Sequence, residues 1–222
     1  MDASGARRGN RALAVGLLDA LGAAGLGEAR ARALAAAGGD ETALRTGRDE
    51  LPAATVMAAF AAASPERTLC RSVGRSVLGP ERQGLALLTG GVGGPEKAYR
   101  RIDQLLPKED PTGAYRAAEI TGGGARVVYA PGEHGVTAAF CGVREGMLAA
   151  IPQLFGLPAG QVRESLCAAR GAPHCVYEVR FARVPRAGLI AGGALGAAAG
   201  LLAAVGLGAS LGGALAAALL AA

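Results

Sequence analysis

Residues 140–181 read FCGVREGMLAAIPQLFGLPAGQVRESLCAARGAPHCVYEVRF, and this stretch decides the fold. Its first part, 142–155, repeats apolar residues at helical spacing and predicts a helix. Residues 162–169 and 174–181 alternate around a turn at 170–173, which predicts a β-hairpin. The apolar face of the predicted helix carries Val143, Met147, Ala150, Ile151 and Leu154.

The sequence before this stretch predicts two more strands and several helices. The strands are expected at 125–130 and 136–141, on either side of the turn sequence PGEHG. Helices followed by strand, strand, helix, strand and strand predict an α+β fold with an antiparallel sheet. The expected helices cover residues 11–36, 52–63, 64–78 and 95–106, the third with Ser64 as its cap and Pro65 at its first position.

The chain divides into three predicted parts. Residues 1–63 form an N-terminal helical region, residues 64–183 form the α+β domain, and residues 184–222 form an apolar segment rich in glycine and alanine. The middle part is long enough to bury a core of its own.

The apolar segment has the character of a membrane span. No charged residue occurs from Ala187 to Ala222, and a single span needs roughly 20 apolar residues. We therefore expect one transmembrane helix or a helical hairpin, with a soluble Ala/Gly-rich helix or a disordered tail as the alternative. Positive flanks favour the cytoplasmic side, so the N-terminal domain is expected in the cytoplasm, tethered to the cell membrane. The flanking arginines are Arg180, Arg183 and Arg186.

Composition argues against two other classes of partner. The net charge of +5 comes from arginines scattered over the sequence and not from a basic block with interleaved aromatic residues, so no nucleic-acid partner is expected. The glycine-rich stretch TGGVGGPEK at 89–97 precedes a predicted helix. Because Lys97 is followed by Ala98 and not by Ser or Thr, the phosphate-binding loop pattern is not met.

Four residues form a candidate metal site: Cys141, Glu164, Cys167 and Cys175. Thiolates and a carboxylate on neighbouring strand ends can close a tetrahedral zinc site, and a closed set of four protein ligands is structural and not catalytic. Free or paired thiols on a hairpin are the alternative, weighed equally from spacing alone. Cys70 is expected in a helix core and is excluded from the set.

Three thiolates and a carboxylate around a divalent zinc leave a net charge of −2. Arg144, Arg163 and Arg170 are near in sequence and can offset this charge. Strand alternation places Arg163 on the face opposite to Glu164.

Residues 140–181 resemble the 4-vinyl reductase (4VR) small-molecule-binding domain, which belongs with the haem–nitric-oxide-binding and TRAPP-type domains. A Cys, a helix running into Phe-Gly, then Glu-x-x-Cys, a turn and a final Cys carry the resemblance. The phenol-sensing activators of this group hold zinc with three Cys and one Glu, and the resemblance implies the same role for Cys141, Glu164, Cys167 and Cys175.

The resemblance also implies a domain that binds a small hydrophobic molecule, forms a homodimer and is the input part of a signalling protein. The sequence has no Trp, and its two histidines, His134 and His174, lie in predicted turns. Phenol recognition by a His and a Trp is therefore not expected, and neither haem nor flavin is expected. The ligand pocket is expected between the sheet and the helix at 142–155, lined by small apolar residues.

Two alternatives to a sensor remain. One is an accessory reductase of tetrapyrrole metabolism, but no dinucleotide fingerprint or iron–sulfur ligand set is present to supply electrons, so an enzyme is not expected. The other is a structural dimerisation or adaptor domain.

Overall fold

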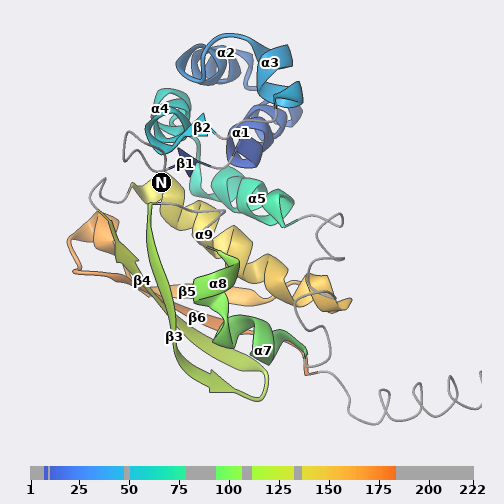
Figure 1. Cartoon of the computed structure of the whole chain (residues 1–222), viewed down its shortest axis with the longest axis vertical. Coiled ribbons are helices and arrows are strands. Elements are labelled where there is room, and N and C mark those ends of the chain that lie inside the picture. The colour runs from blue at the N-terminus through green and yellow to red at the C-terminus, as the bar shows by residue number, and fades with distance from the viewer. Residues whose placement is uncertain are drawn as a thin grey trace, which may run out of the picture. The chain divides into compact units, whose positions relative to one another are not determined.

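The computed structural model of the chain describes residues 8–9, 11–47, 51–78, 94–106, 112–132 and 137–183 (Figure 1). The chain separates into two compact units, residues 1–182 and 183–222, and every element described below belongs to the first. No helix within the described ranges is long and apolar enough to cross a membrane. The predicted membrane segment, 187–222, lies outside the described residues.

The first half of this unit is helical. The described helices are α1 (Arg11–Ala23), α2 (Gly27–Ala36), α3 (Glu41–Thr46), α4 (Ala53–Ala63) and α5 (Arg67–Val77), and a short antiparallel pair joins β1 (Arg8–Gly9) to β2 (Leu51–Pro52). The helix expected over 11–36 is thus two helices, separated by a turn in which Gly25 has a φ of +70°. This left-handed backbone suits glycine because it has no β-carbon.

The second half contains a four-stranded antiparallel sheet and the helices on one of its faces. The elements are α7 (Gly94–Arg100), α8 (Ile102–Leu105), β3 (Gly113–Thr121), β4 (Gly124–Pro131), α9 (Ala138–Ala150), a 3₁₀ turn (Ile151–Phe155), β5 (Gln161–Leu166), a second 3₁₀ turn (Ala168–Arg170) and β6 (Cys175–Arg180). The strand order is β3-β4-β6-β5. The predicted α+β class with an antiparallel sheet is confirmed.

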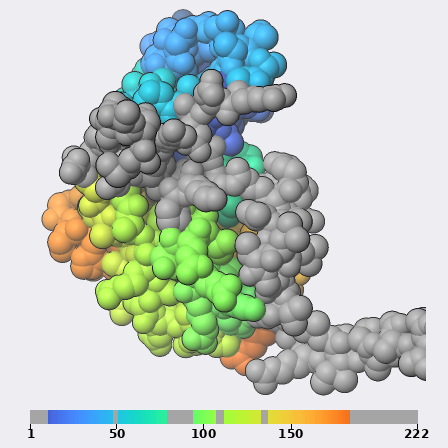
Figure 2. All heavy atoms as spheres, viewed as in Figure 1, coloured from blue at the N-terminus to red at the C-terminus, as the bar shows by residue number. Residues whose placement is uncertain are grey.

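Helix α9 lies between the sheet and the N-terminal helices (Figure 1). Its residues from Phe140 to Leu148 are all buried, as expected for a helix with protein on several sides. The face toward the sheet meets Tyr129 of β4 and Tyr177 of β6, both fully buried. In the space-filling view, the residues of α7, α8, β3 and β4, in green, form one continuous surface (Figure 2).

Glycines set the distance between α5 and α9. A β-carbon on Gly74 of α5 would overlap the carbonyl oxygen of Val143, and one on Gly146 of α9 would overlap that of Arg71. The two helix backbones are therefore in direct contact, a spacing that small residues permit. Cys70 and Val73 of α5 are fully buried at this contact, which confirms the expectation that Cys70 is a core residue.

The structure corrects two further details of the sequence prediction. Residues 136–141 were expected as a strand, but Thr137 caps α9, and its side chain accepts a hydrogen bond from the Phe140 backbone N–H. The apolar spacing of Phe140, Val143 and Met147 is helical, and it continues the helix that was expected from 142. Ser64 was expected to cap α5; instead it ends α4 in a left-handed conformation, φ +44°, and α5 begins at Arg67.

Candidate metal centre

The structure brings all four predicted ligands together. Cys141, Glu164, Cys167 and Cys175 each offer one ligand atom, and these atoms all lie within 4.8 Å of one another. The three cysteines are buried, and the Glu164 side chain is only 2% exposed. Metal binding itself stays a prediction, but the geometry that it needs is present.

Three elements position these residues. Cys141 lies in the first turns of α9, Glu164 lies in β5, Cys167 follows the end of β5, and Cys175 is the first residue of β6. The register of β5 against β6 shifts between Glu164 and Leu166. Such a bulge re-aims the side chains that follow it. The expectation that Cys141 ends a strand is wrong, because its backbone is helical; the predicted hairpin that carries the other three ligands is confirmed.

The distances suit a tetrahedral ion. The Cys141 and Cys167 sulfur atoms are 3.5 Å apart, and two thiolates at 2.3 Å from a tetrahedral zinc are separated by about 3.8 Å. None of the four cysteines is in a disulfide, so the alternative of a Cys167–Cys175 bridge is not what the structure shows. The free-thiol alternative remains, and the metal content of the protein decides it.

Local hydrogen bonds favour a thiolate at Cys175. The pKa of Cys175 is lowered to about 6, first by its hydrogen bond with Cys141 and also by the Ala168 backbone N–H, against the opposing effect of burial. That N–H donates to the Cys175 sulfur at 3.3 Å. In the same pair the pKa of Cys141 is raised, by the hydrogen bond with Cys175 and by burial. Deprotonated thiols are the form that binds metal.

The two oxygens of Glu164 have different surroundings. Oε2 accepts hydrogen bonds from Arg67 Nη2 at 2.6 Å and from Arg170 Nη2 at 3.2 Å. Oε1 is buried and has no hydrogen-bond partner. A buried oxygen without a partner is costly, and a cation bound in the cluster would satisfy it. This orphan oxygen is the strongest single sign of a missing ligand.

Arg67 is the site residue that the sequence did not reveal. It lies on α5, 97 positions before Glu164, so no local spacing could indicate the contact. Its guanidinium also binds Glu145 of α9, at 2.5 Å from Oε1, and Arg71 binds the same carboxylate. Glu145 is buried, with its side chain 2% exposed. Burial acts to raise the Glu145 pKa, but hydrogen bonds from Arg67 and Arg71 outweigh it and hold the pKa below its ordinary value.

The three arginines expected near the site have different roles. Arg170 contacts Glu164, as predicted. Arg163 is exposed whereas its neighbour Glu164 points inward, so the predicted alternation is confirmed. Arg144 is fully buried; its guanidinium carbon lies 3.6 Å from the ring centroid of Tyr129 and its Nη2 donates to the Tyr129 hydroxyl at 2.8 Å.

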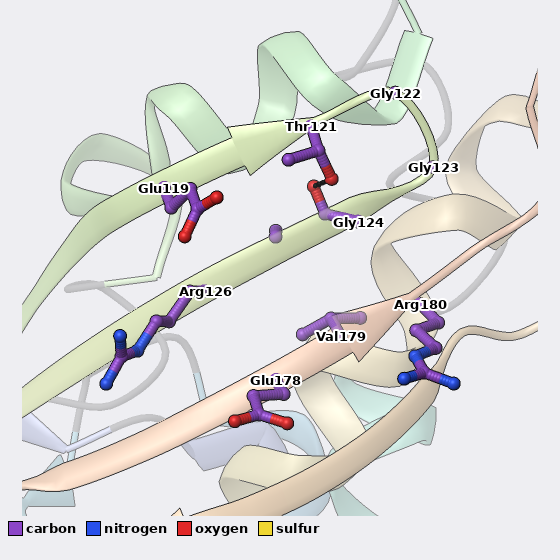
Figure 3. A pocket seen from close by; sticks show the side chains of 10 residues that line it. Glu119, Thr121, Gly122, Gly123, Gly124, Arg126, Glu178, Val179 and Arg180 are labelled. Carbon is purple, nitrogen blue, oxygen red and sulfur yellow. Dashed lines mark hydrogen bonds between the residues drawn. The ribbon is translucent and has the colours of Figure 1, made fainter.

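Large side chains are buried between α9 and the sheet, and the apolar pocket expected there stays a prediction. The largest of them that are fully buried are Arg144, Tyr99, Tyr129, Tyr177 and Met147. A groove of about 530 Å³ lies elsewhere, on the outer face of the sheet, lined in part by Glu119, Arg126, Glu178 and Arg180 (Figure 3). Its lining is charged, so the expectation of an apolar pocket does not describe it.

No family model matches the chain, and no curated protein matches its sequence. Solved structures do share its fold. An H-NOX protein from S. oneidensis in the Fe(II)NO state has 13% sequence identity and a TM-score of 0.52, covering 78% of this chain and 99% of that one. The unliganded Fe(II) H-NOX protein from K. algicida has 9% identity and a TM-score of 0.53, covering 79% of this chain and 97% of that one.

A third neighbour comes from work on haem redox potential and protein-induced porphyrin distortion, with 13% identity, a TM-score of 0.50, and coverage of 77% of this chain and 94% of that one. These neighbours are described with Fe(II) or with haem, which contradicts the expectation that no haem is bound. That expectation rested on the position of two histidines, whereas the likeness lies in the backbone architecture of nearly the whole domain. This chain is similar in fold to the H-NOX proteins, the haem–nitric-oxide-binding architecture.

Proposed function

We propose that this chain is a small-molecule sensor domain on the H-NOX-like fold, in which Cys141, Glu164, Cys167 and Cys175 hold a structural zinc ion. The buried Glu164 Oε1, which has no hydrogen-bond partner and lies in a cluster of three thiols, carries the zinc part of the proposal. The fold neighbours support the sensor part. The motif at 140–181 supports a further part of the proposal, that the chain is a 4VR-type domain within this fold.

A zinc at this position would act on folding. Four protein ligands leave no open position for a substrate or a water molecule. The ion would join the start of α9, the end of β5 and the start of β6. Arg67 and Arg170 would offset the negative charge of the ligand set from the Glu164 side.

Haem is a candidate either for the molecule that the domain detects or for the cofactor with which it detects another molecule. The reason is that the fold neighbours are described with Fe(II) and with haem. Of the two histidines in the sequence, His174 is half-buried in the turn before β6, and His134 lies outside the described residues. None of the described helices carries a histidine. A haem in this chain would thus take its iron ligand from a histidine outside the described helices, a tyrosinate or a thiolate, and these ligand types occur in haem proteins.

The uncharged segment 187–222 supports a further part of the proposal, a membrane tether that keeps the sensor on the cytoplasmic side as the input part of a signalling protein. Its test is direct. The full chain, expressed with the segment, should sediment with membranes and resist extraction by carbonate, and a chain ending at residue 186 should not.

Metal and haem are tested on one preparation of the full chain, purified without added metal or haem. We expect about one zinc per chain by elemental mass spectrometry. Protein that contains no divalent metal, and that takes up none when zinc is added, would overturn the structural site. An absorption band near 400 nm would identify haem as the bound group, and native mass spectrometry would identify any other small molecule that co-purifies.

A further inference from the structure

Four charged side chains form a row across the outer face of the sheet. They are Glu119 of β3, Arg126 of β4, Glu178 of β6 and Arg163 of β5, and all four are exposed. Strand register aligns them, because Glu119 pairs with Arg126, Arg126 with Glu178, and Glu178 with Arg163. Paired residues of adjacent strands point to the same face. Figure 3 shows the first three members on neighbouring strands.

The charges alternate along this row: negative, positive, negative, positive. Opposite charges on adjacent strands stabilise a sheet modestly, and that is one use of the row. Reversing the order of the row also inverts every sign. The row is thus complementary to a reversed copy of itself.

A two-fold axis produces this reversal. Suppose that two copies stack their outer sheet faces about a two-fold axis that runs parallel to the strands, midway between the two sheets and over the gap between β4 and β6. Each row of paired residues then faces the same row of the other copy, with the order of its strands reversed. Glu119 then faces Arg163 of the second copy, and Arg126 faces Glu178. Such a contact is isologous, and it keeps the strand directions of the two sheets aligned, which is a common sheet-on-sheet arrangement.

The neighbouring row fits the same axis. Gly124 of β4 pairs with Arg180 of β6, so reversal places Arg180 of the second copy over Gly124. Gly124 has no side chain of its own, and the nearest side chain to its β-carbon position is the Thr121 hydroxyl, at 2.8 Å. The groove of about 530 Å³ is lined there by Thr121 and the glycines at 122–124 together with the carboxylate of Glu119. A guanidinium from the second copy would find both space and a negative charge.

We propose that the outer sheet face is a homodimer surface, on which the row Glu119–Arg126–Glu178–Arg163 pairs with the same row of a second copy and Arg180 enters the groove over Gly124. The proposal does not depend on zinc or on the sensed ligand. It names a surface for the dimer that the 4VR resemblance implies. Because its contacts are charged and lie at a surface, the association is specific and weakens as salt is raised.

Two double variants test the pairing. Exchanging the charges at 178 and 163 (Glu178→Arg with Arg163→Glu) gives a row of negative, positive, positive, negative. In a dimer of this variant, each charge of the row would face a like charge of the second copy. Exchanging them at 119 and 126 (Glu119→Arg with Arg126→Glu) gives positive, negative, negative, positive, with the same defect. Each variant introduces one like-charge neighbour within its own sheet, so the two are matched in their cost to the fold.

The readout is the sedimentation of the full chain in a mild non-ionic detergent at low salt. We expect the natural chain to be dimeric, each double variant alone to associate about 100-fold more weakly or worse, and an equimolar mixture of the two to recover the dimer, because their rows are complementary. Recovery on mixing cannot come from misfolded chains. Double variants that dimerise alone as the natural chain does, a mixture that stays monomeric, or a natural chain that is monomeric would each overturn the proposal.

Discussion

Gly74 of α5 lies so close to α9 that a β-carbon at this position would overlap the carbonyl oxygen of Val143. About two turns earlier in the same helix, Arg67 binds both Glu145 of α9 and Glu164 of the cluster. The close approach of the helices and the reach of Arg67 are therefore linked. Widening the gap between the backbones would draw the guanidinium away from a predicted metal ligand.

Replacing Gly74 by alanine should therefore destabilise the domain. The added methyl group meets backbone and not a flexible side chain, so the helices must separate, and we expect a loss of about 1–3 kcal/mol in the free energy of unfolding, as overpacking commonly gives. The matched control is Gly27→Ala at the start of α2, where a β-carbon meets nothing within 4 Å. This control should gain about 0.5–1 kcal/mol. Urea denaturation measures both, and equal effects would contradict the backbone contact.

Arg67 and Arg71 make a second matched pair. Both bind Glu145, but only Arg67 also binds Glu164. Residues that hydrogen-bond to a metal ligand typically change metal affinity by about 10–100-fold when they are removed. We expect Arg67→Gln to weaken zinc binding by at least about tenfold and Arg71→Gln to leave it unchanged, as measured by competition with a chromophoric chelator. Equal affinities in the two variants would show that Arg67 does not support the site.

The parts of the site that lie close together in the sequence were predictable, and the parts brought together by packing were not. Glu164, Cys167 and Cys175 lie within one hairpin, so their spacing was enough to indicate a cluster. Cys141 was correctly assigned to the cluster but was placed in a strand. Residues 136–141 (VTAAFC) are too few to show the helical spacing of apolar residues that continues through Val143 and Met147. Arg67 depends on the contact of α5 with α9, which no local pattern records.

The strand β3 was not predicted from the sequence, which shows a second limit of the prediction. Its sequence GAYRAAEIT contains three alanines, and the register against β4 shifts between Ala117 and Glu119. This bulge breaks the alternation of buried and exposed residues on which strand prediction depends. By contrast, β4 alternates without interruption from Ala125 to Tyr129 in its pairing with β6, and it was predicted within a residue or two of its ends.

The pH dependence of stability should carry the signature of Glu145. Its pKa is held below the ordinary value of 4.5, since hydrogen bonds from Arg67 and Arg71 outweigh its burial. A carboxyl with a lowered folded-state pKa contributes stability that is present above the unfolded pKa and is lost as the pH falls through the folded one. In metal-free protein, the stability difference between the natural chain and Glu145→Gln should therefore shrink as the pH falls from 6 toward 3. Urea denaturation across this range checks it, and a constant difference would contradict the ion pair.

The cluster itself is tested by comparing two thiols. Cys167 belongs to it, whereas Cys70 is buried in α5 outside it, where burial raises its pKa to about 11. We expect Cys167→Ser to lose zinc and Cys70→Ser to keep it. A ligand that binds only the folded state stabilises it by about 4 kcal/mol when present at 1,000 times its dissociation constant.

A chelator should accordingly lower the melting temperature of the natural chain and of Cys70→Ser, and leave that of Cys167→Ser unchanged. This comparison separates the loss of metal from the loss of packing, because each protein is measured against itself with and without chelator. A serine at either position also costs some packing, but that cost is present in both measurements and cancels. If the chelator shifts none of the three melting curves, the three thiols and Glu164 form a cluster that holds no metal.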